Sequence, residues 1–168
     1  MGRISRLLKH RWTDESDLRR ALPADALARI EARVAASERH HSGEIRVSVE
    51  AGLPLSYLWQ GLTARDRALT LFGKLRVWDT EQNNGVLIYL LLADHAIEIV
   101  ADRWLTRHVP PAQWQALIAA MQPAFRAGRF EDGLNQAIGA IDALLLQHFA
   151  LAPGQTNPDE LPNRPDLR

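Results

Sequence analysis

The sequence predicts an α/β fold, a three-layer αβα sandwich with a small mixed central β-sheet. The first observation behind this prediction is the unbroken apolar run at 86–93, which a second strand-like segment follows after a tight turn. A strand that is apolar at every position has to be covered on both faces, so helices are expected above and below it. The second observation is the strict alternation of apolar and polar residues at 44–50, and the third is the helical apolar stripe that joins the two strands.

The elements before the apolar run are predicted from capping residues and periodicity. A helix is expected to begin at 22–25 and to stop near Gly43, because proline suits the first helical turn and glycine commonly closes a helix. The alternation at 44–50 predicts a strand with one exposed face, nearer a sheet edge than the apolar run. Thr63 is expected to cap a second helix, whose apolar stripe reaches Leu75.

The connections between the elements predict how the strands pair. A strand, a crossover helix and a strand form a parallel pair in nearly all proteins. The tight turn at Asp94-His95 makes the third strand antiparallel to the second. After the sheet, a helix opens at 110–111 and is expected to kink or split at Pro123, and a last helix begins near Glu131.

One domain with two tails is the predicted organisation. The chain has 168 residues, of which 46% are hydrophobic, enough for one domain with a real core. Residues 1–21 form a basic N-terminal segment, and residues 22–149 form the αβα domain. Residues 150–168 form a proline-rich tail, which is expected to be disordered because it can bury little apolar surface. The basic segment is either a frayed first helix or a surface for anionic lipid or another protein.

Composition excludes several classes of partner and chemistry. Twenty basic residues balance twenty acidic ones, so no nucleic-acid partner is expected. No cysteine is present, which excludes disulfides, thiolate metal sites and cysteine nucleophiles. The run at 86–93 is far shorter than the roughly 20 residues of a transmembrane segment, and the N-terminus lacks the apolar core of a signal peptide. We therefore expect a soluble cytoplasmic protein, with membrane contact limited to the surface.

The predicted topology gathers polar residues at one edge of the sheet. There the start of the first strand lies beside the start of the second strand and the end of the third. Four oxygen-bearing side chains at this edge are the candidate ligands of a divalent cation: Glu44, Asp79, Asn84 and Asp102. Because Ca²⁺ takes roughly six to eight oxygen ligands and Mg²⁺ about six, either ion suits such a set. No organic cofactor is expected.

Each candidate ligand has a structural alternative. Asp79 and Asn84 belong to residue types that cap turns before a strand. Asp102 is followed by Arg103, and exposed pairs of that kind contribute little. Glu44 belongs to the polar face of its strand, where solvated carboxylates are ordinary. The ligand set therefore depends on the predicted geometry.

Other candidate residues carry weaker signals. The pair His40-His41 would suit zinc, but adjacent histidines at a helix end point in different directions. Trp59 and Trp104 either pack in the fold or form an aromatic surface for a partner. The motifs G-x-S-x-G, P-loop, G-x-G-x-x-G and H-E-x-x-H do not occur, so no catalytic nucleophile is assigned and whether the protein is an enzyme stays open.

Several segments in this order resemble a known family. They are Glu44-Ile45-Arg46-Val47 after a helix, Asn84-Gly85-Val86-Leu87-Ile88 leading into Ile97-Glu98-Ile99-Val100, and Phe125-Arg126-Ala127-Gly128 with Gly133-Leu134 following. Over about residues 22–149 the chain resembles the TPM domain family, whose name derives from thylakoid, photosystem II repair and receptor-modulating members. The resemblance implies an αβα sandwich with a small central sheet, and a divalent-cation site at loops along one sheet edge.

The resemblance also implies two kinds of activity. An acid phosphatase activity is attributed to some plant members, whereas others act in assembly or repair of membrane protein complexes without established catalysis. This chain departs from the family at 101–105, where Ala-Asp-Arg-Trp-Leu replaces a Gly-x-Gly-Leu-Glu run. It shows neither the signal peptide nor the membrane anchor of many bacterial members, and so resembles a short cytoplasmic branch.

Three functions therefore remain open. The first is an accessory or binding module that holds Ca²⁺ or Mg²⁺ at the predicted edge and contacts a membrane-associated protein or complex. The second is a metal-assisted acid phosphatase acting on phosphomonoesters, in which the cation polarises the phosphoryl oxygen and activates water. The third is a structural partner without a ligand.

Overall fold

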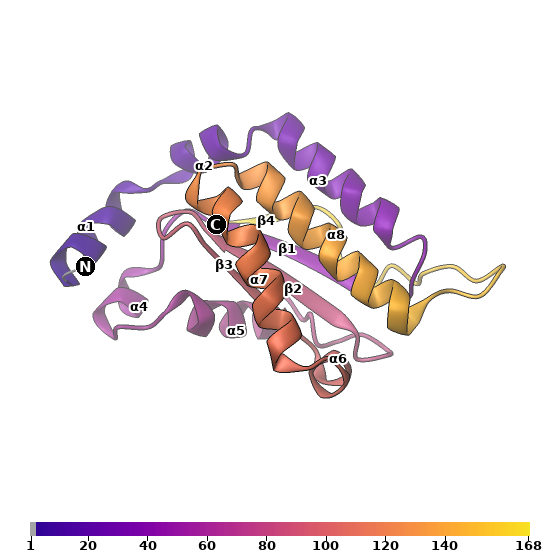
Figure 1. Ribbon diagram of the computed structural model, residues 1–168. Coiled ribbons are helices and arrows are strands. Elements are labelled where there is room, and N and C mark those ends of the chain that lie inside the picture. Colours follow the sequence, from indigo (N-terminus) through magenta and orange to yellow (C-terminus); the bar gives the residue numbers. More distant parts are fainter. Residues whose placement is uncertain (1–2) are drawn as a thin grey trace.

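The structure, a computed structural model, describes residues 3–168 and the side chains of residues 5–168. The elements follow in the order α1 (Arg3–Trp12), α2 (Glu15–Ala21), α3 (Ala24–Ser37), β1 (Glu44–Glu50), α4 (Leu55–Trp59), α5 (Ala64–Lys74), β2 (Gly85–Leu91), β3 (Ala96–Ala101), α6 (Arg103–His108), α7 (Pro111–Arg126), α8 (Phe130–Phe149) and β4 (Asp166–Leu167). Figure 1 shows a small sheet with helices on both of its faces. The predicted αβα sandwich is confirmed.

The sheet is mixed, with the strand order β3-β2-β1-β4. β1 and β2 are parallel, with Glu44 opposite Gly85, and β2 and β3 are antiparallel, as the connections predicted. The amide of Asp102 donates to the carbonyl of Gly85 at 2.9 Å, so the exit of β3 lies beside the entry of β2. β4 adds a short parallel pair to β1, with Ser48 opposite Asp166. The entries of β1 and β2 and the exit of β3 therefore share one rim.

Residues of β2 alternate between two apolar clusters, one on each face of the sheet. Val86, Ile88 and Leu90 belong to the cluster that α3, α7 and α8 cover. Leu87 and Tyr89 belong to the cluster on the α4 and α5 side. Figure 1 shows these helices on opposite sides of the sheet. Burial on both faces explains why β2 is apolar at every position.

Gly85 opens β2 because no larger residue fits at its position. A Cβ there would collide with the carbonyl oxygen of Val77, in the segment that follows α5. Glycine has no Cβ and allows this close approach. Gly85 therefore allows the segment that follows α5 to pack directly against the start of β2.

β1 differs from the half-exposed strand near an edge that its alternation predicted. It lies between β2 and β4, and all of its residues are buried. Its polar side chains lie on the face that also holds Leu87 and Tyr89 of the neighbouring strand. Residues 151–168, here named the C-terminal strap, cover Glu44, Arg46 and Ser48 on this face, and Arg67 of α5 covers Glu50.

The C-terminal strap corrects the expectation of a disordered tail at 150–168. The buried guanidinium of Arg46 donates to the carbonyl of Pro162 at 2.8 Å and also to the carbonyl of Arg164. Leu161 is buried in the cluster on the α4 and α5 side. Hydrogen bonds to polar groups of the domain hold this segment in place. The expectation of disorder considered only its low apolar content.

The N-terminal segment is ordered, with α1 packed on the α4 and α5 side of the sheet and α2 packed on the opposite side. The buried ring of His10 in α1 accepts a hydrogen bond from the amide of Leu53 at 3.0 Å, and its other nitrogen lies 3.2 Å from Asp94. A Cβ at Gly52 would lie 2.6 Å from the carbonyl oxygen of His10, so the two backbones are in close contact. Leu18 of α2 is buried in the core.

Two of the predicted helix features have different outcomes. α5 begins with Thr63 and Asp66 in a capping box, as predicted. α7 runs through Pro123 as one helix and is not split there. Pro123 lies on the exposed side of α7, where a carbonyl without a helical partner meets water. Among residues 3–168, no helix combines the length and the apolar character that crossing a bilayer requires.

Candidate metal centre

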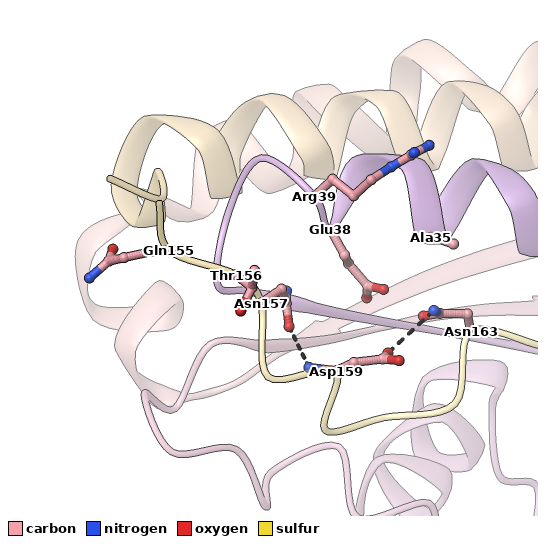
Figure 2. A pocket seen from close by; sticks show the side chains of 8 residues that line it. All are labelled: Ala35, Glu38, Arg39, Gln155, Thr156, Asn157, Asp159 and Asn163. Carbon is pink, nitrogen blue, oxygen red and sulfur yellow. Dashed lines mark hydrogen bonds between the residues drawn. The ribbon is translucent and has the colours of Figure 1, made fainter. Parts of the chain in front are cut away.

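A pocket of about 270 Å³ opens where the end of α3 meets the C-terminal strap (Figure 2). Its lining consists of Ala35, Glu38, Arg39, Gln155, Thr156, Asn157, Asp159 and Asn163. In Figure 2 the side chains of Glu38 and Asp159 extend into the same hollow, whereas Arg39 extends away from it. The inner part of this pocket is therefore acidic and rich in oxygen atoms.

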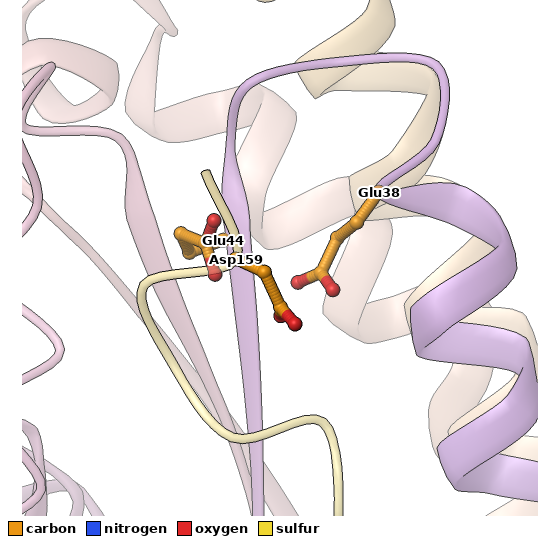
Figure 3. A group of neighbouring side chains, drawn as sticks. All are labelled: Glu38, Glu44 and Asp159. Atoms are coloured by element: carbon orange, nitrogen blue, oxygen red, sulfur yellow. The ribbon is translucent and has the colours of Figure 1, made fainter. Parts of the chain in front are cut away.

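Three carboxylates converge at this pocket: Glu38 after α3, Glu44 at the start of β1 and Asp159 of the strap (Figure 3). One oxygen of each can be chosen so that all lie within 4.8 Å of one another. Glu38 is 4% exposed and Glu44 is 0% exposed, whereas Asp159 is exposed. Within the described part of the chain, no other three residues of the types His, Asp and Glu meet in this way.

The turn between α3 and β1 holds Glu38 in place. The backbone amide of Glu38 caps α3 by donating to Val34, and one carboxylate oxygen, Oε1, accepts from the amide of Ile45 at 2.9 Å. The second oxygen, Oε2, is buried and has no hydrogen-bond partner among the described residues. An unpaired buried carboxylate oxygen is costly.

Glu44 has the same arrangement on the other side of the cluster. Its Oε2 accepts from the amide of Leu161 in the strap at 3.1 Å. Its Oε1 is buried and lacks a partner among residues 3–168. Each of the two buried glutamates thus uses one oxygen to hold the backbone and leaves the other unused.

The strap presents Asp159 through a local hydrogen-bonded turn. Asp159 adopts a positive φ of 53°, its amide donates to Asn157 Oδ1 at 2.7 Å, and its Oδ1 accepts from Asn163 at 3.3 Å. Asn157 anchors the turn, because its Nδ2 donates to the carbonyls of His41 at 2.8 Å and Gly43 at 3.2 Å. The Oδ1 of Asn163 is a further buried oxygen without a partner in the described chain.

Burial and mutual repulsion make the two glutamates weak acids. Burial raises the pKa of Glu38 to about 8, and the neighbouring charges of Glu44 and Asp159 add to the rise. Burial likewise raises the pKa of Glu44 to about 7, against the lowering effect of the Leu161 amide. No Lys, Arg or His of the described chain forms an ion pair with any of the three acids. The cluster therefore has no cationic partner among the described residues.

The structure brings one of the four predicted ligands, Glu44, into the cluster. Asp79 is exposed in the loop before β2, with its Oδ2 4.0 Å from the guanidinium of Arg76. Asp79 therefore lies outside the cluster of Glu38, Glu44 and Asp159.

Asn84 and Asp102 lie at the shared rim, where Asn84 links two loops and Asp102 caps a helix. Asn84 Nδ2 donates to the carbonyl of Ser42 at 3.0 Å. Asp102 is the N-cap of α6, and its Oδ1 accepts from the amide of Arg103 at 2.6 Å. Asn84 Oδ1 and Asp102 Oδ2 are nevertheless buried without a partner in residues 3–168. Their role as cation ligands therefore stays a prediction.

Sequence reasoning did not include Glu38 and Asp159 among the candidate ligands. Glu38 is close in sequence to the pair His40-His41, yet the ring of His41 is directed elsewhere, with Nδ1 3.1 Å from the carbonyl of Gly43 and Nε2 3.3 Å from Asp142. Asp159 belongs to the segment that was expected to be disordered. The pair Asn157-Pro158 before Asp159 is a local signal of a turn, and it does not indicate which strand the turn meets.

The family model of the TPM domain matches residues 16–144 of this chain. The chain belongs to the TPM domain family. The matched residues begin in α2 and end in α8. Glu38 and Glu44 of this TPM domain therefore lie inside the matched range, and Asp159 lies outside it. No curated protein matches the sequence significantly.

Two solved structures are similar to this TPM domain. The BA42 protein of the psychrophilic bacterium Bizionia argentinensis is 28% identical with a TM-score of 0.75, and the alignment covers 88% of this chain and 95% of that one. The N-terminal domain of a protein from P. gingivalis is 22% identical with a TM-score of 0.60, over 78% of this chain and 83% of that one. The second similarity concerns the fold alone.

Proposed function

We propose that this TPM domain is a binding module that holds a divalent cation between Glu38, Glu44 and Asp159. One observation carries the proposal: Glu38 and Glu44 each leave a buried oxygen without a partner beside a third carboxylate. Ionising two buried acids without a counter-charge destabilises the fold. A bound cation would stabilise the ionised form and use the free oxygens.

Ca²⁺ and Mg²⁺ are the ions that this ligand chemistry favours. The three acids and the nearby amide of Asn163 offer only oxygen, which hard cations prefer. The chain has no cysteine, and His41, the buried histidine between Glu38 and Glu44 in the sequence, contacts Gly43 and Asp142 instead. Softer ions such as Zn²⁺ lack their preferred ligands here.

A thermal-shift series with Ca²⁺, Mg²⁺, Mn²⁺ and Zn²⁺ tests this proposal. Binding to the folded state alone stabilises it by about 2.7 kcal/mol when the free ion is about 100 times its Kd. We expect Ca²⁺ or Mg²⁺ to raise the Tm of the wild type, and Asp159→Asn to lose most of that rise. Asp79→Asn is the matched control, because Asp79 is an exposed acid outside the cluster.

Two results would contradict the assignment. The first is a Tm that does not change with millimolar Ca²⁺ or Mg²⁺. The second is an equal rise in the wild type and in Asp159→Asn, which would place the ion elsewhere. A rise lost in Asp79→Asn and kept in Asp159→Asn would instead favour the ligand set predicted at the rim.

We also propose that the domain acts in the cytoplasm as an accessory to a membrane-associated protein or complex. Support comes from the TPM family, some members of which assist membrane protein complexes, and from the lack of a nucleophile motif in the sequence. Crosslinking of the wild type in cells, followed by identification of the attached proteins, tests this role. Attachment to no membrane-associated protein would contradict it.

A metal-assisted acid phosphatase is the alternative. The observation that favours it is the pocket of about 270 Å³ beside the carboxylates, which has room for a phosphate group. Arg39, the one basic residue of the described lining, extends away from the hollow (Figure 2). The cation would therefore have to neutralise the negative charge of a bound phosphomonoester. Hydrolysis of p-nitrophenyl phosphate that is equal in the wild type and in Asp159→Asn would exclude this site as its origin.

A further inference from the structure

Four large apolar side chains are exposed on two neighbouring helices at one end of the molecule. They are Leu8 and Trp12 of α1, with exposed fractions of 48% and 75%, and Leu55 and Trp59 of α4, with 53% and 72%. α1 and α4 are in contact and lie together at the same end in Figure 1. We name these four residues the α1–α4 surface. The other large exposed apolar residues of the described chain are scattered over later elements.

The exposed pair on α1 results from how this helix packs. Leu7 packs against the cluster on the α4 and α5 side, and His10 is buried against Leu53. Leu8 and Trp12 are four residues apart and therefore share one face of the helix. That face is turned away from the core.

α4 repeats this arrangement. Leu58 is buried, whereas Leu55 and Trp59, again four residues apart, are exposed. Exposed apolar residues are ordinary when they occur singly, but an apolar group of this kind marks an interaction surface.

The charges around α1 determine which partner this surface suits. α1 contains the basic residues Arg3, Arg6, Lys9, His10 and Arg11 and no acid. Asp94 of the β2–β3 turn faces three of them, at 3.8 Å from Arg6, 3.7 Å from Lys9 and 3.2 Å from His10. Arg11 is exposed and forms no ion pair with any described residue. One carboxylate cannot balance these cations, so the helix keeps an excess of positive charge.

We propose that the α1–α4 surface binds an anionic phospholipid membrane, with α1 lying in the plane of the interface. Leucine and tryptophan flanked by Lys and Arg are the composition of helices that lie at a lipid–water boundary. Basic residues near the surface add attraction to anionic headgroups. The positive charge distinguishes this face from the rest of a chain whose net charge is +0.

The membrane surface is independent of the cation site. Gly52, just beyond the end of β1, contacts the backbone of α1, whereas Glu44 of the carboxylate cluster opens the same strand. The two sites therefore lie at opposite ends of β1. Binding to vesicles in the presence of EDTA tests the membrane surface alone.

Flotation of the full chain with vesicles is the experiment. We expect binding to vesicles that contain phosphatidylglycerol, little binding to vesicles of phosphatidylcholine alone, and weaker binding at high salt because screening reduces the attraction. Replacing Leu8 and Trp12 by alanine removes apolar groups from the interface and lowers the partition coefficient by about tenfold or more. The matched control replaces the exposed Leu69 and Trp78 by alanine and leaves the coefficient unchanged.

The charge contribution is tested with Arg11→Glu, which is expected to weaken binding to the anionic vesicles. Arg107→Glu, at an exposed position of α6, is the control and keeps wild-type binding. The Tm of every variant is measured, and the exposed positions are expected to leave it unchanged. No binding to anionic vesicles, or equal losses in test and control variants, would overturn the proposal in favour of another kind of partner.

Discussion

Glu50 and Glu44 are both buried acids on β1, yet only Glu50 has a complete set of partners. Arg67 donates to the two oxygens of Glu50 at 2.9 Å and 2.7 Å, and the hydroxyl of Tyr89 donates at 2.7 Å. The guanidinium of Arg67 also lies over the ring of Tyr57, 5.1 Å from its centroid. Glu50 is thus a structural charge, and the contrast identifies Glu44 as the acid that still lacks a counter-charge.

We predict that replacing Arg67 greatly lowers the stability of the fold. Arg67→Met leaves Glu50 buried with only Tyr89, so we expect the free energy of unfolding to fall by about 3–5 kcal/mol in urea denaturation. Arg76→Met, at an exposed arginine, is the control and should change it little. A loss below about 1 kcal/mol in Arg67→Met would show that this ion pair is not structurally important.

His41 gives the protein a pH dependence below neutrality. Its buried ring lies 3.1 Å from the carbonyl of Gly43 and 3.3 Å from Asp142. Burial lowers the pKa of His41 below its usual 6.5, and this effect outweighs the attraction of Asp142. The unfolded chain therefore binds a proton more readily than the folded one. The contribution of His41 to stability is complete above about pH 6.5 and falls as the pH drops through the lowered pKa.

We expect this effect to appear as a difference between two proteins. The free energy of unfolding of the wild type should fall more between about pH 7.5 and about pH 5.5 than that of His41→Gln, because glutamine does not titrate. Comparing the two slopes cancels the contribution of the other acidic and basic groups. Parallel pH profiles would mean that His41 becomes protonated as easily in the folded state as in the unfolded chain.

At the scale of elements, the C-terminal strap has a structural role and also supplies Asp159 to the proposed cation site. It pairs with β1 through β4, and its Leu161 amide is held by Glu44. If a cation links Asp159 to the two glutamates, opening the strap releases the ion. Binding of the cation should therefore hold the strap closed.

Hydrogen exchange checks this linkage. At a free cation concentration of about 100 times Kd, exchange of the Leu161 amide through strap opening should slow by up to about 100-fold. Asp159→Asn should remove that protection, and amides in the middle of α8 should not respond. Protection that persists in Asp159→Asn would separate the strap from the cation site.

Local sequence patterns predicted most of the elements. They failed where burial depends on a segment that is distant in the sequence. The Thr63 cap and the apolar run of β2 depend on neighbouring residues and on burial, and both are confirmed. The alternation of β1 predicted one exposed face, because polar residues usually face water. Around Arg46 that face is buried, because the guanidinium of Arg46 donates to strap carbonyls that are distant in the sequence. The separation from Arg46 to Pro162 is 116 positions.

At the scale of the whole molecule, topology could be predicted better than the site. The crossover and the tight turn determine the strand pairing, and pairing determines which loops share a rim. Predicting the carboxylate cluster also requires knowing the path of the strap. Leu161 meets Glu44 across a separation of 117, and no periodicity in one sequence predicts such a contact. Sequence reasoning therefore included Glu44 among the candidate ligands and did not include Glu38 and Asp159.

The origin of Asp159 has a consequence for how this centre can change. Two of its acids belong to the inherited domain, and the third comes from an extension that follows the matched residues. A relative with the same core and a different C-terminal segment would therefore lack the third acid of the proposed site. Any preference for one ion over another at the proposed site would then depend on that segment, with the fold left unaltered.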